Sequence, residues 1–138
     1  MAETFSGRCH CGAVEFEVEG EAPMQGYCHC ADCQGWSGTP VTAFAMWPAD
    51  KVRFTKGAEN VISFQRDVEA NNTIRRSCKT CGGAVPSLIP QLGMSDAYPM
   101  LIKDYPFKPT MHAQVADSVL KIDDDLPKFD RWPPQPEG

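Results

Sequence analysis

Apolar and charged side chains alternate strictly near the N-terminus. In the segment AVEFEVEG, Val14, Phe16 and Val18 are separated by three glutamates. Successive side chains of a strand point to opposite faces, so this period of two predicts a half-buried strand with a wet outer face.

Further apolar segments are short and are separated by Gly, Asn and Pro, which favour turns. They predict strands at Val41–Trp47, Val52–Thr55, Val61–Arg66, Asn71–Cys78, Ala84–Ile89 and Met111–Val119. No segment keeps a helical period over three turns, and short helical turns are expected only near ADCQGWSG and in the tail. The sequence therefore predicts a mostly β, single-domain fold of short antiparallel strands, with metal-binding knuckles at its turns.

Length and charge narrow the class of protein. A chain of 138 residues suits one domain, and a net charge of −5 argues against nucleic acid as the main partner. No stretch approaches the roughly 18 apolar residues of a membrane helix, and the N-terminus lacks the build of a signal peptide. We expect a cytoplasmic protein without a membrane partner.

The C-terminal DDDLPKFDRWPP is expected to form a strap that lays Phe129 and Trp132 on the edge of the core, or alternatively a lid over a pocket.

The number and spacing of the cysteines indicate metal-binding sites. Seven is an odd number, and C-x-C and C-x-x-C spacings in a reducing compartment are typical of metal ligands or redox thiols. Two such turns complete a tetrahedron, so one closed four-sulfur site is predicted from the pairs Cys9, Cys11 and Cys78, Cys81. If the four-sulfur site instead took cysteines from other clusters, three of the seven cysteines would still remain outside it.

The remaining cluster, YCHCADC, offers Cys28, Cys30 and Cys33. Catalytic zinc sites keep three protein ligands and an open fourth position, whereas structural sites are closed. Three thiolates make the ion a poor Lewis acid and a good partner for a soft ligand, so a substrate thiol is the expected fourth ligand.

Three histidines accompany these clusters. His10 and His29 each stand between two cysteines, where the middle side chain of a C-x-C turn tends to point away from the ion. We expect both to lie beside a metal site or in solvent rather than to bind metal. His112, at the start of a predicted strand, is expected to be a hydrogen-bonded structural histidine.

The ordered set GRCHCGAVEFEVEG, YCHCADCQGWSG, RSCKTCGG and DDDLPKF resembles the glutathione-dependent formaldehyde-activating enzyme (GFA) family, also called CENP-V/GFA. The resemblance covers roughly residues 5–130, which we take as the domain, and leaves 131–138 as a Pro-rich tail. It implies a tent-like β fold with about two zinc ions per chain. The implied structural zinc lies on Cys9, Cys11, Cys78 and Cys81, and the implied catalytic zinc on Cys28, Cys30 and Cys33.

The activity that the resemblance implies is that of a carbon–sulfur lyase. In this family glutathione adds to formaldehyde and gives S-hydroxymethylglutathione, so the expected partners are a small-molecule thiol and an aldehyde. Two alternatives belong to other classes of function. One is a non-enzymatic, zinc-stabilised binding module, and the other is a redox site formed by Cys30 and Cys33.

Overall fold

The computed structural model describes residues 3–134, so the expected Pro-rich tail is described only to residue 134 and residues 135–138 lie outside. The chain divides into two units, each built from two segments. The first unit comprises the described part of Met1–Met24 together with Ala45–Pro106. The second unit comprises Gln25–Phe44 together with the described part of Phe107–Gly138.

The alternating segment near the N-terminus lies in a three-stranded antiparallel sheet of the first unit. The strands are, in spatial order, β1 (Thr4–Arg8), β2 (Glu15–Glu19) and β5 (Val52–Lys56). Phe16 and Val18 of β2 are fully buried, whereas Glu17 pairs with Arg53 across the outer face at 2.6 Å. The alternation thus separates a dry face from a wet one, as the sequence predicts.

The second sheet of the first unit is also antiparallel. Its strands are, in spatial order, β4 (Thr42–Pro48, here from Ala45), β9 (Met94–Ala97), β8 (Ala84–Ile89), β7 (Ile74–Cys78) and β6 (Val61–Gln65). Trp47 of β4 is almost completely buried, and its indole N–H donates to the Gly20 carbonyl at 2.9 Å. Its ring also packs edge-on against Tyr105 at 5.4 Å, which anchors the core of this unit.

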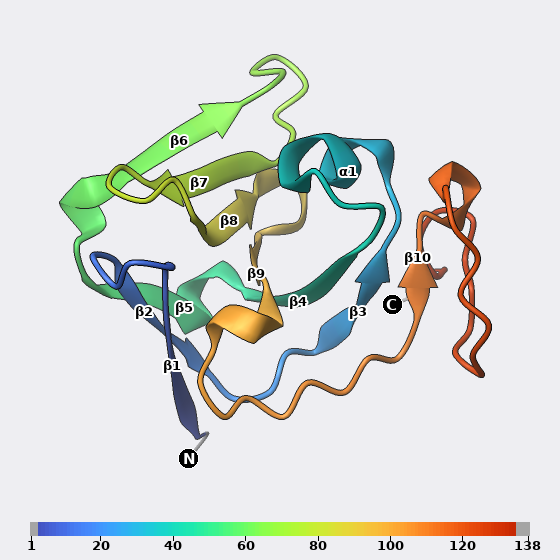
Figure 1. Cartoon of the computed structure of the whole chain (residues 1–138), viewed down its shortest axis with the longest axis horizontal. Helices are drawn as coiled ribbons and strands as arrows, with labels where there is room; N and C mark the ends of the chain where they lie inside the picture. Colours follow the sequence, from blue (N-terminus) through green and yellow to red (C-terminus); the bar gives the residue numbers. More distant parts are fainter. Residues whose placement is uncertain (1–2, 135–138) are drawn as a thin grey trace. The chain divides into compact units, whose positions relative to one another are not determined.

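The second unit contains β3 (Met24–Cys28, here from Gln25), α1 (Ala31–Ser37) and β10 (His112–Ala113). β10 runs parallel to β3. Residues 114–134, here called the strap, return along the other side of β10, where His112 N–H donates to Pro127 O and Phe129 N–H to His112 O, each at 2.9 Å (Figure 1). Trp132 packs edge-on against Phe44 at 5.6 Å, as expected for a strap that covers an apolar edge.

Short 3₁₀ helices connect several strands. They are η1 (Ala49–Lys51), η2 (Ala58–Asn60), η3 (Pro90–Leu92), η4 (Pro99–Leu101) and η5 (Val115–Asp117). No helix formed by residues 3–134 has the length and apolar character needed to span a membrane.

The mostly β prediction is confirmed, as is the helical turn near ADCQGWSG. The predicted strand Met111–Val119 is wrong beyond Ala113, because Gln114 adopts a left-handed backbone (φ 58°) and turns the chain into η5. The helical turn expected in the tail is absent from residues 118–134. Three strands escaped the sequence analysis, namely β1, β3 and β9.

Two of these strands are hidden because glycine or glutamine occupies some of their inward positions. In β1 the inward residue Gly7 lies so close to the ring of Phe16 that a Cβ would overlap it. In β3, Gln25 and Gly26 are both buried, and the Gln25 side chain accepts the N–H of Lys108 at 3.2 Å. A pattern of hydrophobic positions cannot report strands of this kind.

Gly26 offers a test of the close approach between β3 and β10. A Cβ at this position would overlap the carbonyl oxygen of Met111, which is backbone and cannot rotate away. Gly26→Ala should lower the free energy of unfolding by about 1–3 kcal/mol, as overpacking does. The matched variant Gly35→Ala, in α1 with open space around it, should be neutral or stabilise by up to about 1 kcal/mol. Denaturant unfolding measures both, and equal effects would contradict the predicted clash.

Candidate functional site

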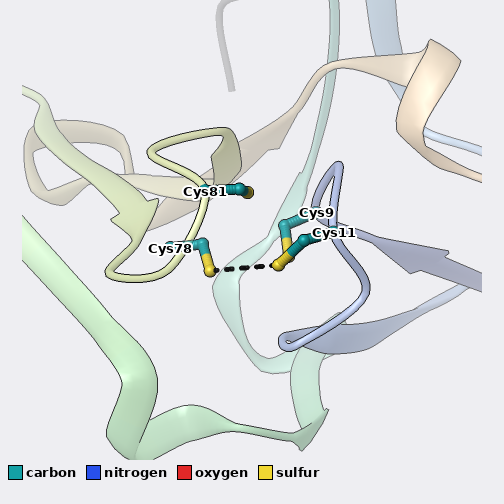
Figure 2. Close-up of side chains that lie close together, drawn as sticks. All are labelled: Cys9, Cys11, Cys78 and Cys81. Atoms are coloured by element: carbon teal, nitrogen blue, oxygen red, sulfur yellow. Dashed lines mark hydrogen bonds between the residues drawn. The ribbon is translucent and has the colours of Figure 1, made fainter.

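Four thiols of the first unit converge from two distant segments. Cys9 and Cys11 follow β1, whereas Cys78 ends β7 and Cys81 lies in the turn before β8; all four sulfurs lie within 4.8 Å of one another (Figure 2). The Cys11 sulfur is 3.8 Å from both the Cys9 and the Cys78 sulfur. Four sulfurs bound to one zinc ion at about 2.3 Å would stand about 3.8 Å apart at the corners of a tetrahedron. The observed spacing fits a metal site and is far too long for a disulfide.

Backbone N–H groups surround these sulfurs. Gly12 and Gly82 have positive φ (83° and 74°), which turns the following N–H groups inward. Each sulfur accepts one backbone N–H at 3.3–3.4 Å. The donors are Val14 to Cys9, Ala13 to Cys11, Thr80 to Cys78 and Gly83 to Cys81. The N–H groups of Cys81 and then Thr80 help lower the pKa of Cys78 to about 6. The turns therefore stabilise thiolates, the form that binds metal.

The second unit holds a three-thiol cluster. Cys28 ends β3, Cys30 caps the start of α1, and Cys33 lies in the first turn of α1. Their sulfurs lie within 4.8 Å of one another, and those of Cys28 and Cys33 are 3.7 Å apart, which again fits a tetrahedral edge. Cys28 is buried, whereas Cys30 and Cys33 are partly exposed. Within residues 3–134, no histidine or carboxylate joins this group.

Close packing of the three thiols opposes their ionisation. Contacts with Cys30 and then Cys33, reinforced by burial, raise the pKa of Cys28 far above its ordinary value. For Cys30, contact with Cys28 lowers the pKa, but contact with Cys33 and burial outweigh it and bring the value to about 11. A bound cation would remove this penalty, because metal displaces the protons of its thiol ligands. The donor set therefore suits a soft divalent metal.

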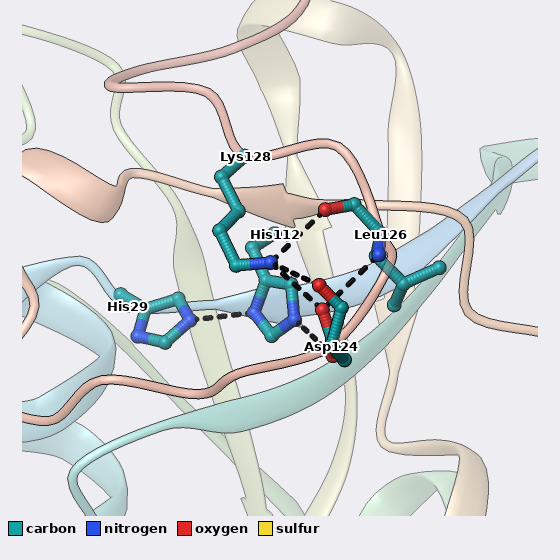
Figure 3. Close-up of polar contacts among 5 residues, drawn as sticks. All are labelled: His29, His112, Asp124, Leu126 and Lys128. Atoms are coloured by element: carbon teal, nitrogen blue, oxygen red, sulfur yellow. Dashed lines mark hydrogen bonds and ion pairs between the residues drawn. The ribbon is translucent and has the colours of Figure 1, made fainter.

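His29 lies between two thiols of this cluster, but its side chain belongs to another network (Figure 3). The imidazoles of His29 and His112 are almost completely buried, and His29 Nε2 lies 2.9 Å from His112 Nδ1. His112 Nε2 lies 2.8 Å from a carboxylate oxygen of Asp124, whose other oxygen accepts from Lys128 Nζ at 2.8 Å. Contact with Lys128 and then with His112 keeps the pKa of Asp124 well below its ordinary value.

With both rings neutral, this chain of contacts assigns the hydrogen atoms on the rings. A carboxylate only accepts, so His112 Nε2 must donate to Asp124. In a neutral ring, His112 Nδ1 then accepts, and His29 Nε2 must donate to it. Burial and then the neighbouring His112 lower the pKa of His29, which favours its neutral form. His29 Nδ1 is thus left as an acceptor, and it has no hydrogen-bond partner within the part of the chain that the structure describes.

The strap also holds the start of α1. The Asp117 carboxylate accepts the N–H of Ala31 at 3.1 Å and pairs with Arg131 at 3.2 Å. The Gln34 side chain donates to the carbonyls of His29 at 2.7 Å and of Asp117 at 3.0 Å. These bonds fix the segment that carries Cys30 and Cys33, although residues 114–134 contribute no thiol to the group.

The predicted site residues therefore form the two predicted groups. His10 is exposed, His29 is buried beside the thiols, and His112 is hydrogen-bonded on both ring nitrogens. Sequence reasoning missed Asp124 and Lys128. The i, i+4 spacing of Asp124, within an acidic run, and Lys128 was a visible signal, but only the fold shows that His112 lies against Asp124.

The family profile described as glutathione-dependent formaldehyde-activating enzyme (GFA) matches residues 4–113, a range that contains all seven cysteines. The chain belongs to the GFA family. The GFA match ends at Ala113, so the whole strap, including Asp124 and Lys128, lies beyond it.

A solved structure shares the fold of this GFA chain. It is the crystal structure of a Rhodobacter sphaeroides protein, with 22% sequence identity and a TM-score of 0.56. The alignment covers 72% of this chain and 88% of that protein. At this identity the likeness concerns the fold alone.

Metal content tests the two thiol groups together. Freshly purified, reduced protein should contain about two zinc ions per chain by elemental analysis, one for each tetrahedral group. A reproducible content of zero would contradict both sites, and a content near one would show that only the four-thiol group retains its ion.

Cys78→Ser tests the structural weight of the four-thiol group. This site joins segments about 70 residues apart, and its metal-binding free energy is also folding free energy. The variant should lose one zinc equivalent and about 4 kcal/mol or more of unfolding free energy. Cys30→Ser is the matched control. It removes a ligand from the three-thiol group, which closes only a local loop, and should therefore lose much less unfolding free energy. An unchanged melting temperature for Cys78→Ser would refute the assignment.

Proposed function

We propose that this protein is a zinc-dependent carbon–sulfur lyase that acts on glutathione, or another small thiol, and an aldehyde such as formaldehyde. The observation that carries the proposal is the three-thiol group, whose partly exposed Cys30 and Cys33 adjoin no fourth protein ligand among residues 3–134. Membership of the GFA family supports the same chemistry. Because the thiols must stay reduced, the proposed location is the cytoplasm.

In this proposal Cys28, Cys30 and Cys33 hold the catalytic ion, and the four-thiol group of the first unit holds a structural one. Zinc bound by three thiolates would supply an open position that prefers a soft thiolate ligand. Cys28, buried at the end of β3, fixes one corner of the group, while Cys30 and Cys33 are tied to the start of α1. The N–H of Cys33 donates to the Cys30 sulfur at 3.2 Å and so holds that side chain in place.

The proposed reaction forms one carbon–sulfur bond without oxidation or reduction. The sulfur of the substrate thiolate attacks the carbonyl carbon, the carbonyl π electrons move to oxygen, and the proton released by the thiol ends on that oxygen. The product is an S-hydroxymethyl-type adduct. In the reverse direction the hydroxyl proton leaves and the carbon–sulfur bond breaks.

Cobalt substitution tests the proposed open position. Glutathione added to protein with cobalt in place of zinc should change the visible spectrum, because a fourth thiolate enters the coordination sphere. S-Methylglutathione, which lacks a free thiol, should leave the spectrum unchanged. A spectrum that stays constant at millimolar glutathione, in protein shown to hold cobalt at the three-thiol group, would count against glutathione and favour the binding-module alternative.

Cys30→Ser and Cys33→Ser test the reaction itself. Each should keep the β fold and about one zinc ion, since the four-thiol group is untouched, and should lose catalysed exchange between glutathione, formaldehyde and their adduct. Exchange can be followed by NMR line shapes against the uncatalysed rate. Wild-type activity in a variant that has lost its second zinc would refute the proposal. Activity that instead follows a reversible Cys30–Cys33 disulfide would favour the redox alternative.

A further inference from the structure

The helix α1 positions two of the three thiols of the second unit but buries none of its own side chains. Cys30 caps its start and Cys33 lies in its first turn, and none of its seven residues is buried. A helix this short is marginal in water without tertiary contacts. The directions of the Cys30 and Cys33 side chains therefore depend on polar contacts at the start of the helix.

Two side chains supply these contacts. Gln34 Nε2, in α1, donates to the His29 carbonyl at 2.7 Å and to the Asp117 carbonyl at 3.0 Å. The Asp117 carboxylate accepts the N–H of Ala31 at 3.1 Å. Because His29 and Ala31 are the chain neighbours of Cys30, these three hydrogen bonds hold the backbone on both sides of one thiol and join it to the strap.

The strap is itself fixed near Asp117 by a second set of contacts. Gln114 has a left-handed backbone (φ 58°), and its N–H donates to the Arg131 carbonyl at 2.7 Å. The Arg131 guanidinium pairs with Asp117 at 3.2 Å and donates to the Gln114 side chain at 2.9 Å. A left-handed backbone is unfavourable for a residue with a Cβ and persists where its surroundings determine it. These contacts therefore present Asp117 to α1 in a defined position.

Packing places this part of the strap less firmly than the hydrogen bonds do. A cavity of about 370 Å³ is lined by His29 and His112 together with Val115 and residues 118–122 of the strap. A side chain that faces a cavity has few partner atoms on that side. Asp117 lies within this hollow segment, so its hydrogen bonds to α1 determine how the strap and the helix meet.

We propose that Gln34 and Asp117 are positioning residues of the three-thiol group, and that the strap acts through them to raise the affinity of this group for its metal ion. The inference rests on the proposed metal site at Cys28, Cys30 and Cys33. Groups that orient metal ligands commonly change metal affinity by about 10–100-fold when they are removed. Asp117 lies beyond the GFA match, so this control belongs to the strap.

Metal affinity measured separately at each thiol group tests the proposal. Full-length protein loaded with NMR-active cadmium, a soft ion that thiolates bind, should give one cadmium resonance for each group, and Cys30→Ser assigns them. Competition with a chelator then measures both affinities. Gln34→Met, which removes the donor and keeps the length, and Asp117→Ala should each weaken cadmium binding at the three-thiol group by about tenfold. The four-thiol group should be unchanged in both variants.

Matched variants separate positioning from charge and from general stability. Asp117→Asn keeps an oxygen that can accept the Ala31 N–H, so its affinity should stay within about twofold of wild type. Asp123→Ala removes a carboxylate of the strap that has no hydrogen-bond or ion-pair partner among residues 3–134, and it should have no effect. Gln91→Met removes a similar bond in the first unit, to the Ala70 carbonyl at 2.7 Å, and should leave the three-thiol group unchanged.

Amide hydrogen exchange gives an independent readout. Coupling between two binding events is reciprocal, so an ion in the three-thiol group must strengthen the contact between the strap and α1. Removal of that ion should speed exchange of the Ala31 N–H by about tenfold, the same factor that the variants lose in affinity. The Lys103 N–H, which donates to the Ser6 carbonyl at 2.8 Å in the first unit, is the control and should not change.

Four results would overturn the inference. They are wild-type affinity at the three-thiol group in Gln34→Met or Asp117→Ala, equal weakening of both thiol groups, a loss in Asp117→Asn as large as in Asp117→Ala, and Ala31 exchange that ignores the ion. In each case the wild-type protein still gives two cadmium resonances, so the proposed function would stand. A wild-type protein without the three-thiol resonance would overturn the inference and the proposed function together.

Discussion

Thiolates that gather at one point repel one another unless a cation lies between them. In the first unit this constraint acts on four sulfurs from segments far apart in the chain, and the turns after Cys9 and Cys78 supply N–H groups that stabilise the negative charge. The sulfur spacing of 3.8 Å is what a tetrahedral ion requires. The ends of β1 and β7 thus meet where a bound cation would offset the charge of four thiolates.

The three thiols of the second unit also need a cation between them if they ionise, but they supply only three of the four ligands of a tetrahedral ion. Their sulfurs come from one short segment, where β3 ends and α1 begins, and two of the thiols are partly exposed. An ion held there would retain room for an outside ligand. The contrast between the two groups is therefore one of topology: the first closes a long connection, and the second holds a local turn in position for chemistry.

Buried polar groups determine the structure around that turn. His29 and His112 can be buried because each shares a hydrogen with a neighbour, and the series ends on the Asp124 carboxylate and the Lys128 ammonium group. The strap supplies both of these charged residues. It also forms most of the cavity wall, so one segment satisfies the histidines and shapes the space beside them. Neither role would be apparent from the thiol clusters alone.

The sequence by itself determined the β class, the division of the cysteines and the family, since side-chain alternation and thiolate spacing are local properties. It could not reveal β1 or β3, because Gly7, Gln25 and Gly26 occupy inward positions where apolar residues would be expected. It likewise placed His112 as a structural histidine but could not link it to Asp124. The tertiary structure decided that link, because a hydrogen bond between buried side chains depends on how β10 and the strap pack, and no spacing along the chain encodes that packing.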